Sequence, residues 1–294
     1  MVYAFILSQE LIFPVLTMCH VLSVSRSCYY VYRKNGYTVE RSAEKKIEAQ
    51  VVDAFTLHKR RYGVRRLVPE LLDQGLKIGH YKVRKILSRK GLKAIQPKSF
   101  VPRTTDSRHP YPISPNLLKG KALPVKINQV WVGDITFIPL KGGGWCYLSV
   151  WMDLFSRKVA GWQLLSHMKE TLIIEAFKKA WLNRTAAKGM IIHSDRGGQY
   201  AGNIFRKLLN GHKLLQSMSG VDNPYDNAFM ESYFSRFKAE LLQGGAFEGL
   251  ENARLAIFEY IETYYNPIRR HSALGYISPM AFERKMSFPQ KAEV

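Results

Sequence analysis

The spacing of apolar residues changes near residue 129, and this change constrains the fold more than any other feature of the chain. Three runs rich in β-branched and aromatic residues, at 130–140, 145–155 and 157–165, are separated by short turns and predict an antiparallel meander. Helical and extended patterns then alternate: helices at 171–183 and 203–212, strands at 189–194 and 213–219, and long helices at 227–242 and 250–265. A meander followed by alternating helix and strand is typical of an α/β layer fold.

The first 94 residues show helical spacing instead. Residues 13–33 predict two short helices with a break at Ser23, the second opened by Ser25, which is a good N-cap. Such a pair is a helix-turn-helix or an ordinary helical hairpin, and the pattern alone leaves both open. Three more helices are predicted at Ala43–Arg60, Val64–Asp73 and His80–Lys90, with glycines at their ends. Residues 96–125 hold six prolines and little apolar periodicity, which predicts a linker.

Positive charge is concentrated in this helical part. The chain has 44 Lys and Arg against 23 Asp and Glu, and residues 51–100 alone hold 13 basic and three acidic side chains. Such an excess predicts nucleic acid as partner, although a merely solvated basic face is the alternative. In the helix predicted at 80–90 an apolar stripe faces inward, and we expect the remaining basic side chains to contact DNA. These are Lys82, Arg84, Lys85, Arg89 and Lys90.

Cysteine usage and the apolar start restrict the setting. Cys19, Cys28 and Cys146 are odd in number and form no C-x-x-C pair, which favours free thiols in a reducing compartment. The first 22 residues are apolar, but Gln9-Glu10 and Pro14 interrupt them well short of the ~20 apolar residues that a membrane span needs. We therefore expect a cytoplasmic protein with no membrane partner.

Three acidic residues lie at positions that call for a structural or functional explanation. Asp134 lies inside the first predicted strand, and Asp195 ends the strand "IIHS" just before Arg-Gly-Gly. Glu231 shares a helical face with Lys238. Taken singly, each has a structural interpretation: a hydrogen-bonded strand acid, a turn residue and a solvated helix residue. Taken together, they predict an oxygen-ligand site for two Mg²⁺ or Mn²⁺ ions acting on phosphodiesters, with Lys238 near the nucleic acid. For Asp153 we expect only a strand-end or Asx-turn role.

The local sequences around these acids resemble a known family. Thirty-five residues separate Asp195 from Glu231, and the chain contains "WVGDITFI", "DLFSRKVAGW", "HSDRGGQY", "DNAFMESYFSRFKAE" and "YYNPIRRHSALGYISPMAFE" in that order. The resemblance is to the OrfB transposases of the insertion-sequence-three family, which carry a DDE integrase core with a ribonuclease-H-like fold. Its departures are small: Ser23 and Cys28 stand where the first helix-turn-helix of that family has glycines.

The resemblance implies a fold, an activity and partners. It implies a ribonuclease-H-like mixed sheet flanked by helices, preceded by all-α helix-turn-helix segments. It also implies that Asp134, Asp195 and Glu231 are catalytic metal ligands for cleavage at insertion-sequence ends and for strand transfer into target DNA. The implied partners are DNA, further copies of the chain on that DNA, and an upstream OrfA product supplied separately or by frameshift fusion. The implied location is the bacterial cytoplasm, at the nucleoid.

The expected organisation follows from these patterns. We predict an N-terminal helix-turn-helix segment (1–41), a basic three-helix DNA-binding domain (42–95), a Pro-rich linker (96–125), a DDE core (126–286) and a tail (287–294). Two other functions are considered. A non-catalytic DNA-binding regulator leaves the three acids without a role, and a structure-selective nuclease of the same fold leaves the family sequences unexplained.

Overall fold

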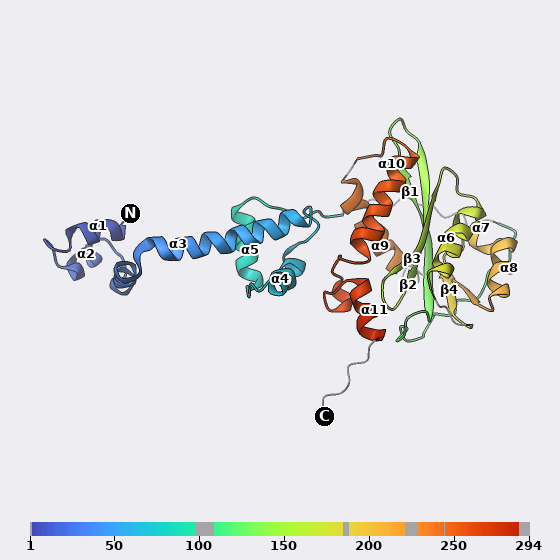
Figure 1. The fold of residues 1–294 in the computed structure, drawn as a ribbon, viewed down its shortest axis with the longest axis horizontal. Helices are drawn as coiled ribbons and strands as arrows, with labels where there is room; N and C mark the ends of the chain where they lie inside the picture. Colours follow the sequence, from blue (N-terminus) through green and yellow to red (C-terminus); the bar gives the residue numbers. More distant parts are fainter. Residues whose placement is uncertain (1, 98–108, 185–187, 221–227, 244, 288–294) are drawn as a thin grey trace, which may run out of the picture. The chain divides into compact units, whose positions relative to one another are not determined.

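A computed structural model of the protein describes residues 2–97, 109–184, 188–220, 228–243 and 245–287, with backbone alone for 35–42. The chain divides into two compact units, Met1–Ala94 and Ile95–Val294 (Figure 1). The first unit is helical and the second contains the sheet. Within the described residues no helix is both long and apolar enough to cross a membrane.

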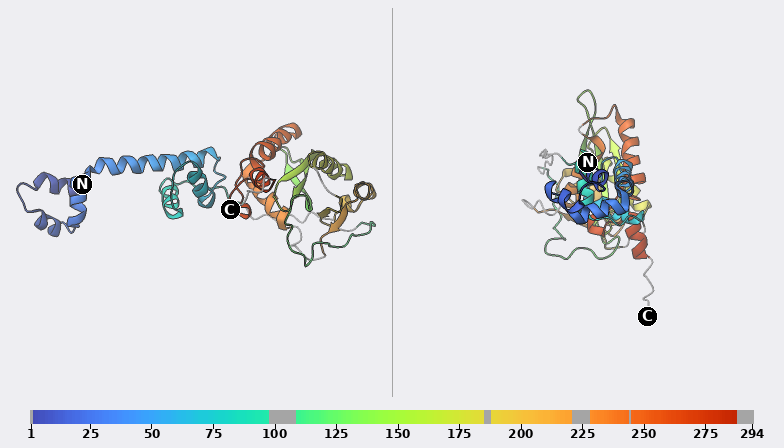
Figure 2. Two further views of the ribbon diagram at one scale, coloured as in Figure 1. Left: turned by 60° about the horizontal axis from the view of Figure 1, so that its bottom comes forward. Right: turned by 90° about the vertical axis from the view of Figure 1, so that its left-hand side faces the viewer.

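The N-terminal unit begins with two short helices, α1 (Val2–Gln9) and α2 (Val15–Val21). They lie against the first turns of the long helix α3 (Arg26–Leu57), as Figures 1 and 2 show. The small core between them consists of Ile6, Met18, Cys19 and Tyr29. The prediction of a separate helix beginning near residue 43 is wrong, because α3 continues without a break from residue 26 to residue 57.

The predicted break at Ser23 is confirmed, and its backbone conformation explains why glycine suits this position. Ser23 has φ 52°, a left-handed conformation that glycine adopts at lower cost. Two residues later the Ser25 hydroxyl accepts a hydrogen bond from the Cys28 N–H at 3.4 Å and caps α3, as predicted. Cys28 itself lies within α3, so its position needs no glycine.

Helices α4 (Val64–Asp73) and α5 (His80–Arg89) complete the first unit, close to their predicted bounds. Gly75 and Gly91 follow them with φ 84° and 64°, the left-handed conformation expected just after a helix. The apolar stripes of α3, α4 and α5 meet in one core. Its buried members include Val51, Phe55, Leu67, Leu71, Val83 and Ile86.

The second unit is built on a five-stranded mixed sheet with the strand order β3-β2-β1-β4-β5. The predicted meander is confirmed: β1 (Val130–Pro139), β2 (Trp145–Asp153) and β3 (Val159–Leu165) pair antiparallel. Strands β4 (Ile191–Ser194) and β5 (Leu215–Met218) then extend the sheet in parallel on the other side of β1. The fold class expected from the sequence is therefore confirmed.

Helices cover both faces of this sheet (Figure 1). On one face lie α6 (Glu170–Leu182), the one-turn helix α7 (Gly198–Ala201) and α8 (Asn203–Gly211). On the other face lie α9 (Ala228–Leu242) and α10 (Leu250–Phe258). The sequence patterns anticipated four of these five helices and missed α7.

Aromatic rings fill the space between the sheet and α6. The Trp151 ring packs against Phe177, Tyr200 and Phe205 with centroid separations of 5.7–5.8 Å. The approach of α6 to β3 depends on Gly161, since a Cβ there would lie 2.4 Å from the Ala180 nitrogen. Helix and strand are therefore in close backbone contact at this point.

The C-terminal region departs from prediction in its details. The helix predicted at 250–265 is α-helical only to Phe258 and continues as the π-helical segment η2 (Glu259–Tyr265). A short 3-10 turn, η3 (Ser272–Leu274), and the helix α11 (Pro279–Ser287) follow, and neither was predicted. Much of the predicted linker, 98–108, lies outside the described residues.

Candidate functional site

Asp134 and Asp195 lie at corresponding positions of two adjacent parallel strands. The ladder between β1 and β4 pairs Val130 with Ile191 and ends where Val132 faces His193. Each aspartate is two residues beyond that last pair, Asp134 within β1 and Asp195 just after β4 ends. Both side chains are half-buried. The sheet therefore brings the two predicted aspartates to one place, at the point where β1 runs on without β4.

The pKa of the buried Tyr200 hydroxyl depends on the carboxylates of both Asp134 and Asp195. Burial raises the pKa of Tyr200 well above its ordinary value, and the negative charges of Asp134 and then Asp195 raise it further. Tyr200 belongs to α7, the one-turn helix just after the Asp195 loop. Two acids acting on one buried group support the proximity that the strand register indicates.

Local hydrogen bonds orient both carboxylates. Asp195 Oδ1 accepts the Gly197 N–H at 3.0 Å, an Asx-type turn that directs the carboxylate over its own loop. Asp134 Oδ1 accepts the N–H of the next residue, Ile135, at 2.8 Å. Strand β4 stops at Ser194 because Asp, Gly and Gly follow, all of which are poor strand formers. Asp195 is half-exposed in this loop.

Glu231 and Lys238 come from α9, which packs on β1. Glu231 lies in the first turn and is exposed, and Lys238 lies seven residues later on the same helical face. Burial lowers the pKa of Lys238, whereas the charge of Asp134 acts in the opposite direction. Lys238 therefore lies within electrostatic range of Asp134, on the helix that packs on β1.

Asp134, Asp195 and Glu231 do not form a single cluster of metal ligands. Among the described residues, no three His, Cys, Asp or Glu side chains are grouped closely enough to hold a metal ion. Two of the three, Asp134 and Asp195, are brought together by the sheet, and Glu231 lies on the neighbouring helix. Residues 221–227, which connect β5 to α9, are outside the described residues.

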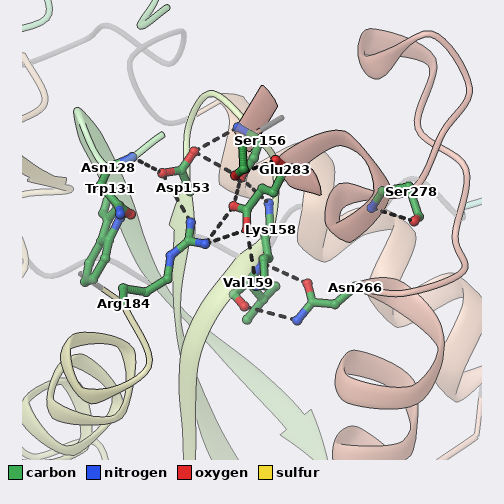
Figure 3. A network of polar contacts seen from close by, with 12 residues as sticks. Asn128, Trp131, Asp153, Ser156, Lys158, Val159, Arg184, Asn266, Ser278 and Glu283 are labelled. Atoms are coloured by element: carbon green, nitrogen blue, oxygen red, sulfur yellow. Dashed lines mark hydrogen bonds and ion pairs between the residues drawn. The ribbon is translucent and has the colours of Figure 1, made fainter. Parts of the chain in front are cut away.

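Asp153, expected to have a structural role only, is fully buried at the end of β2 (Figure 3). Its Oδ1 accepts the N–H groups of Phe155 and Ser156 at 3.0 and 2.8 Å, and its Oδ2 accepts the Asn128 N–H at 2.7 Å. The Arg184 guanidinium lies 3.4 Å from Oδ2. The strand-end and Asx-turn interpretation is confirmed.

The same network joins the C-terminal family sequence "YYNPIRRHSALGYISPMAFE" (264–283), termed the C-terminal signature, to the sheet (Figure 3). Glu283 of α11 accepts hydrogen bonds from Arg184 at 2.7 Å and from the Ser156 hydroxyl at 2.6 Å. Burial alone would raise the pKa of Glu283, but the bonds from Arg184 and Ser156 outweigh it and lower that pKa. Asn266 holds β3 by exchanging two hydrogen bonds with the Val159 backbone. Part of the signature therefore closes the fold around β2 and β3.

A buried ion pair anchors the C-terminal half of α9. Arg269 donates to Glu240 through Nε at 2.9 Å and Nη2 at 2.6 Å, and the Tyr260 hydroxyl also donates to Glu240, at 2.9 Å. Both charged side chains are 3% exposed. Glu240 is two residues beyond Lys238, so this pair fixes the helix that carries Lys238 and Glu231. Sequence reasoning missed it, because an acid on a helix normally faces solvent.

The basic side chains of α5 fall into two groups. Lys82, Arg84 and Lys85 are exposed. Arg89 and Lys90 are exposed as well, but they contact Glu48 of α3, at 2.5 and 2.7 Å. These contacts lower the pKa of Glu48, the Lys90 hydrogen bond most strongly. The two groups therefore differ in their availability for an external anion.

Comparisons with known proteins agree with this arrangement. Two models described as "Integrase core domain" match residues 124–224 and 212–279, and one described as "HTH-like domain" matches residues 42–100. "Transposase InsF for insertion sequence IS3A" of Escherichia coli strain K12 is 38% identical over 97% of this chain and 99% of its own length. "Insertion element IS600 uncharacterized 31 kDa protein" of Shigella sonnei is 35% identical over 91% of this chain and 98% of its own length.

Among solved structures, the HTLV-2 integrase catalytic core domain in complex with magnesium is 19% identical, with a TM-score of 0.42, over 54% of this chain and 97% of its own. The relationship to the transposases is far closer and extends over nearly the whole length of both proteins. This chain therefore belongs to the IS3-family transposases, with an HTH-like domain followed by an integrase core, and its function is DNA transposition.

Proposed function

We propose that this transposase cleaves DNA at the ends of its insertion sequence and joins them to target DNA, using Asp134, Asp195 and Glu231 as catalytic metal ligands. The observation that carries the proposal is the matched position of Asp134 and Asp195 on β1 and β4. Family membership supports transfer of polynucleotide strands as the class of reaction. The assignment of these three residues goes beyond that membership.

The donor set fits hard divalent cations. Carboxylate oxygens are what Mg²⁺ and Mn²⁺ prefer, and two half-buried aspartates side by side need a positive counter-charge. Asp134 and Asp195 would hold the cations, and Glu231 of α9 would complete the set. When bound, a pair of such ions supplies Lewis-acid stabilisation for the attacking and leaving oxygens of a phosphodiester.

The remaining groups of the site bind and orient DNA. Lys238, partly buried near Asp134, would contact a phosphate beside the scissile bond. The turn at Gly197 holds Asp195 in its orientation before substrate arrives. Lys82, Arg84 and Lys85 on α5 are the side chains we propose for DNA contact in the HTH-like domain. Arg89 and Lys90 are proposed only as a weaker, flanking set, because Glu48 already engages them.

We further propose that the active form is a homo-oligomer on DNA, acting with an upstream OrfA product in the bacterial cytoplasm at the nucleoid. Support comes from family membership alone. Mixing inactive and active copies on one pair of DNA ends tests the oligomer. If several subunits act together, activity should fall more steeply than the fraction of active copies.

The decisive experiment measures end cleavage and joining on DNA that carries the element's own ends, with Mg²⁺ or Mn²⁺. Asp195→Asn, Asp134→Asn and Glu231→Gln should lose both activities and still bind DNA, because asparagine and glutamine keep size but remove the charge that holds a cation. The control is Asp153→Asn, which alters a buried structural acid of the same sheet outside the site. It should lower stability, because Arg184 loses one of its two carboxylate partners, but it should keep metal-dependent cleavage when assayed well below its unfolding midpoint. Activity retained by the Asp195 variant would refute the assignment.

The same assay separates the two other functions. A regulator that only binds DNA would give no metal-dependent cleavage in any variant. A nuclease of this fold would give cleavage without joining of the 3′ ends.

A further inference from the structure

The described part of the predicted linker is bonded to the sheet. Several hydrogen bonds join residues 109–118, termed the strap, to the core, and three of them involve β5 and the Asp195 loop. His109 Nε2 lies 2.8 Å from the Arg196 carbonyl oxygen, the Ser114 hydroxyl donates to Gln216 at 2.8 Å, and the Leu117 N–H donates to the Ser217 hydroxyl at 2.9 Å. Two of the three partners belong to β5, and the third belongs to the Asp195 loop.

The hydrogen bonds of His109 define its tautomer. The Tyr111 N–H donates to His109 Nδ1 at 3.3 Å, so Nδ1 carries the lone pair. The proton of the neutral ring is then on Nε2, which donates to the Arg196 carbonyl oxygen. The ring also packs on the loop, because a Cβ built at Gly198 would lie 3.4 Å from His109 Cδ2. His109 is thus held at both nitrogens and directed at the loop.

The Arg196–Gly197 peptide unit connects His109 to Asp195. Its carbonyl oxygen accepts from His109, and its N–H donates to Asp195 Oδ1 at 3.0 Å. A peptide unit is planar and rigid, so fixing the direction of its carbonyl also fixes the direction of its N–H. Hydrogen bonds in such a chain also strengthen one another.

The other side of the loop is fixed independently. The Arg196 side chain donates through Nε to the Ser219 carbonyl oxygen at 2.7 Å, beyond the end of β5. That bond holds the Arg196 side chain, but it does not fix the rotation of the Arg196–Gly197 peptide plane. The bond from His109 acts on the plane itself, which is the element that contacts the carboxylate.

We propose that His109 is a positioning residue for Asp195, acting through the Arg196–Gly197 peptide unit. The proposal rests on the proposed role of Asp195 as a metal ligand. Groups that orient a metal ligand without touching the metal commonly change affinity or activity 10–100-fold when removed. The linker segment that leads into the core thereby takes part in shaping the active site.

The test compares His109→Ala and His109→Gln in the full chain. In the metal-free protein, hydrogen exchange of the peptide covering residues 193–200 should become about fivefold faster in the alanine variant, the effect of one neutral hydrogen bond. The Mg²⁺ concentration for half-maximal cleavage should rise about tenfold, with DNA affinity unchanged. Glutamine offers both a donor for Arg196 and an acceptor for Tyr111, so His109→Gln should recover most of both losses.

Ser114→Ala is the matched control, since it loosens the same strap while keeping the bond to Arg196. Equal effects of Ser114→Ala and His109→Ala, or no recovery with glutamine, would overturn a specific role for His109. Wild-type exchange and wild-type Mg²⁺ dependence in His109→Ala would also overturn it. An active Asp195→Asn protein would instead remove the proposed role of Asp195, a result that the exchange measurement does not depend on.

Discussion

Replacement of Arg269 by methionine should destabilise the core far more than a typical substitution. The variant keeps the aliphatic length of the side chain but leaves the Glu240 carboxylate buried without the guanidinium that donates to both of its oxygens. With both side chains only 3% exposed, solvent does not replace the lost bonds. Breaking a buried pair in this way costs about 3–5 kcal/mol.

The chain provides its own probe for this measurement. All five tryptophans lie in the second unit, so tryptophan fluorescence during urea unfolding of the full chain reports on that unit. A loss of about 4 kcal/mol with an m-value of roughly 2 kcal/mol/M lowers the urea midpoint by ~2 M. Replacing Glu240 by leucine in the same protein removes the isolated charge and should recover much of the loss.

A midpoint within about 0.5 M of the wild type for Arg269→Met would refute this reasoning. So would a double variant less stable than the single one, because the cost would then come from lost packing and not from the unpaired charge. Activity measured well below the midpoint gives a second readout. Since the pair anchors the helix that carries Lys238, strand transfer should decline before the fold is lost.

Three further predictions concern other parts of the chain. Gly161→Ala should lower the free energy of unfolding by about 3 kcal/mol in the same urea assay, because the added Cβ meets α6 backbone at 2.4 Å; an unchanged midpoint would contradict this. Ser23→Gly should raise the thermal stability of the N-terminal unit by about 1 kcal/mol, measured by circular dichroism, because glycine relieves the left-handed serine. Replacing Lys82, Arg84 and Lys85 with alanine should weaken DNA binding and reduce the salt slope by about 2; an unchanged slope would mark this face as merely solvated.

Elements with clear boundary residues were predictable from the sequence. Gly63 and Gly75 flank α4, and its predicted and observed bounds agree. The meander was predictable because β-branched and aromatic residues follow one another between turns. The continuity of α3 was not predictable. Two weak helical patterns that follow one another give the same sequence pattern whether they form one helix or two.

The sequence indicated the residues of the proposed site but not their geometry. The sequence indicated Asp134 and Asp195 as unusual acids, yet only the register of β1 with β4 shows that they lie at matching positions. Register depends on pairing between distant segments, which local patterns do not specify. His109 was missed for a related reason: in a Pro-rich segment a lone histidine carries no periodic signal, and its partner is 87 residues away.

The strand order has a consequence for when the proposed active site forms during folding. Strands β1, β2 and β3 pair through short hairpin connections, whereas β4 joins β1 only after α6 has crossed over the sheet. Pairing of neighbouring segments is fast, and closing the longer loop is slower because more chain entropy is lost first. We expect Asp134 to take its native position early in folding, and Asp195 to come next to it late. Newly made chains should therefore pass through a structured but inactive intermediate, and DNA cleavage by immature protein should be suppressed.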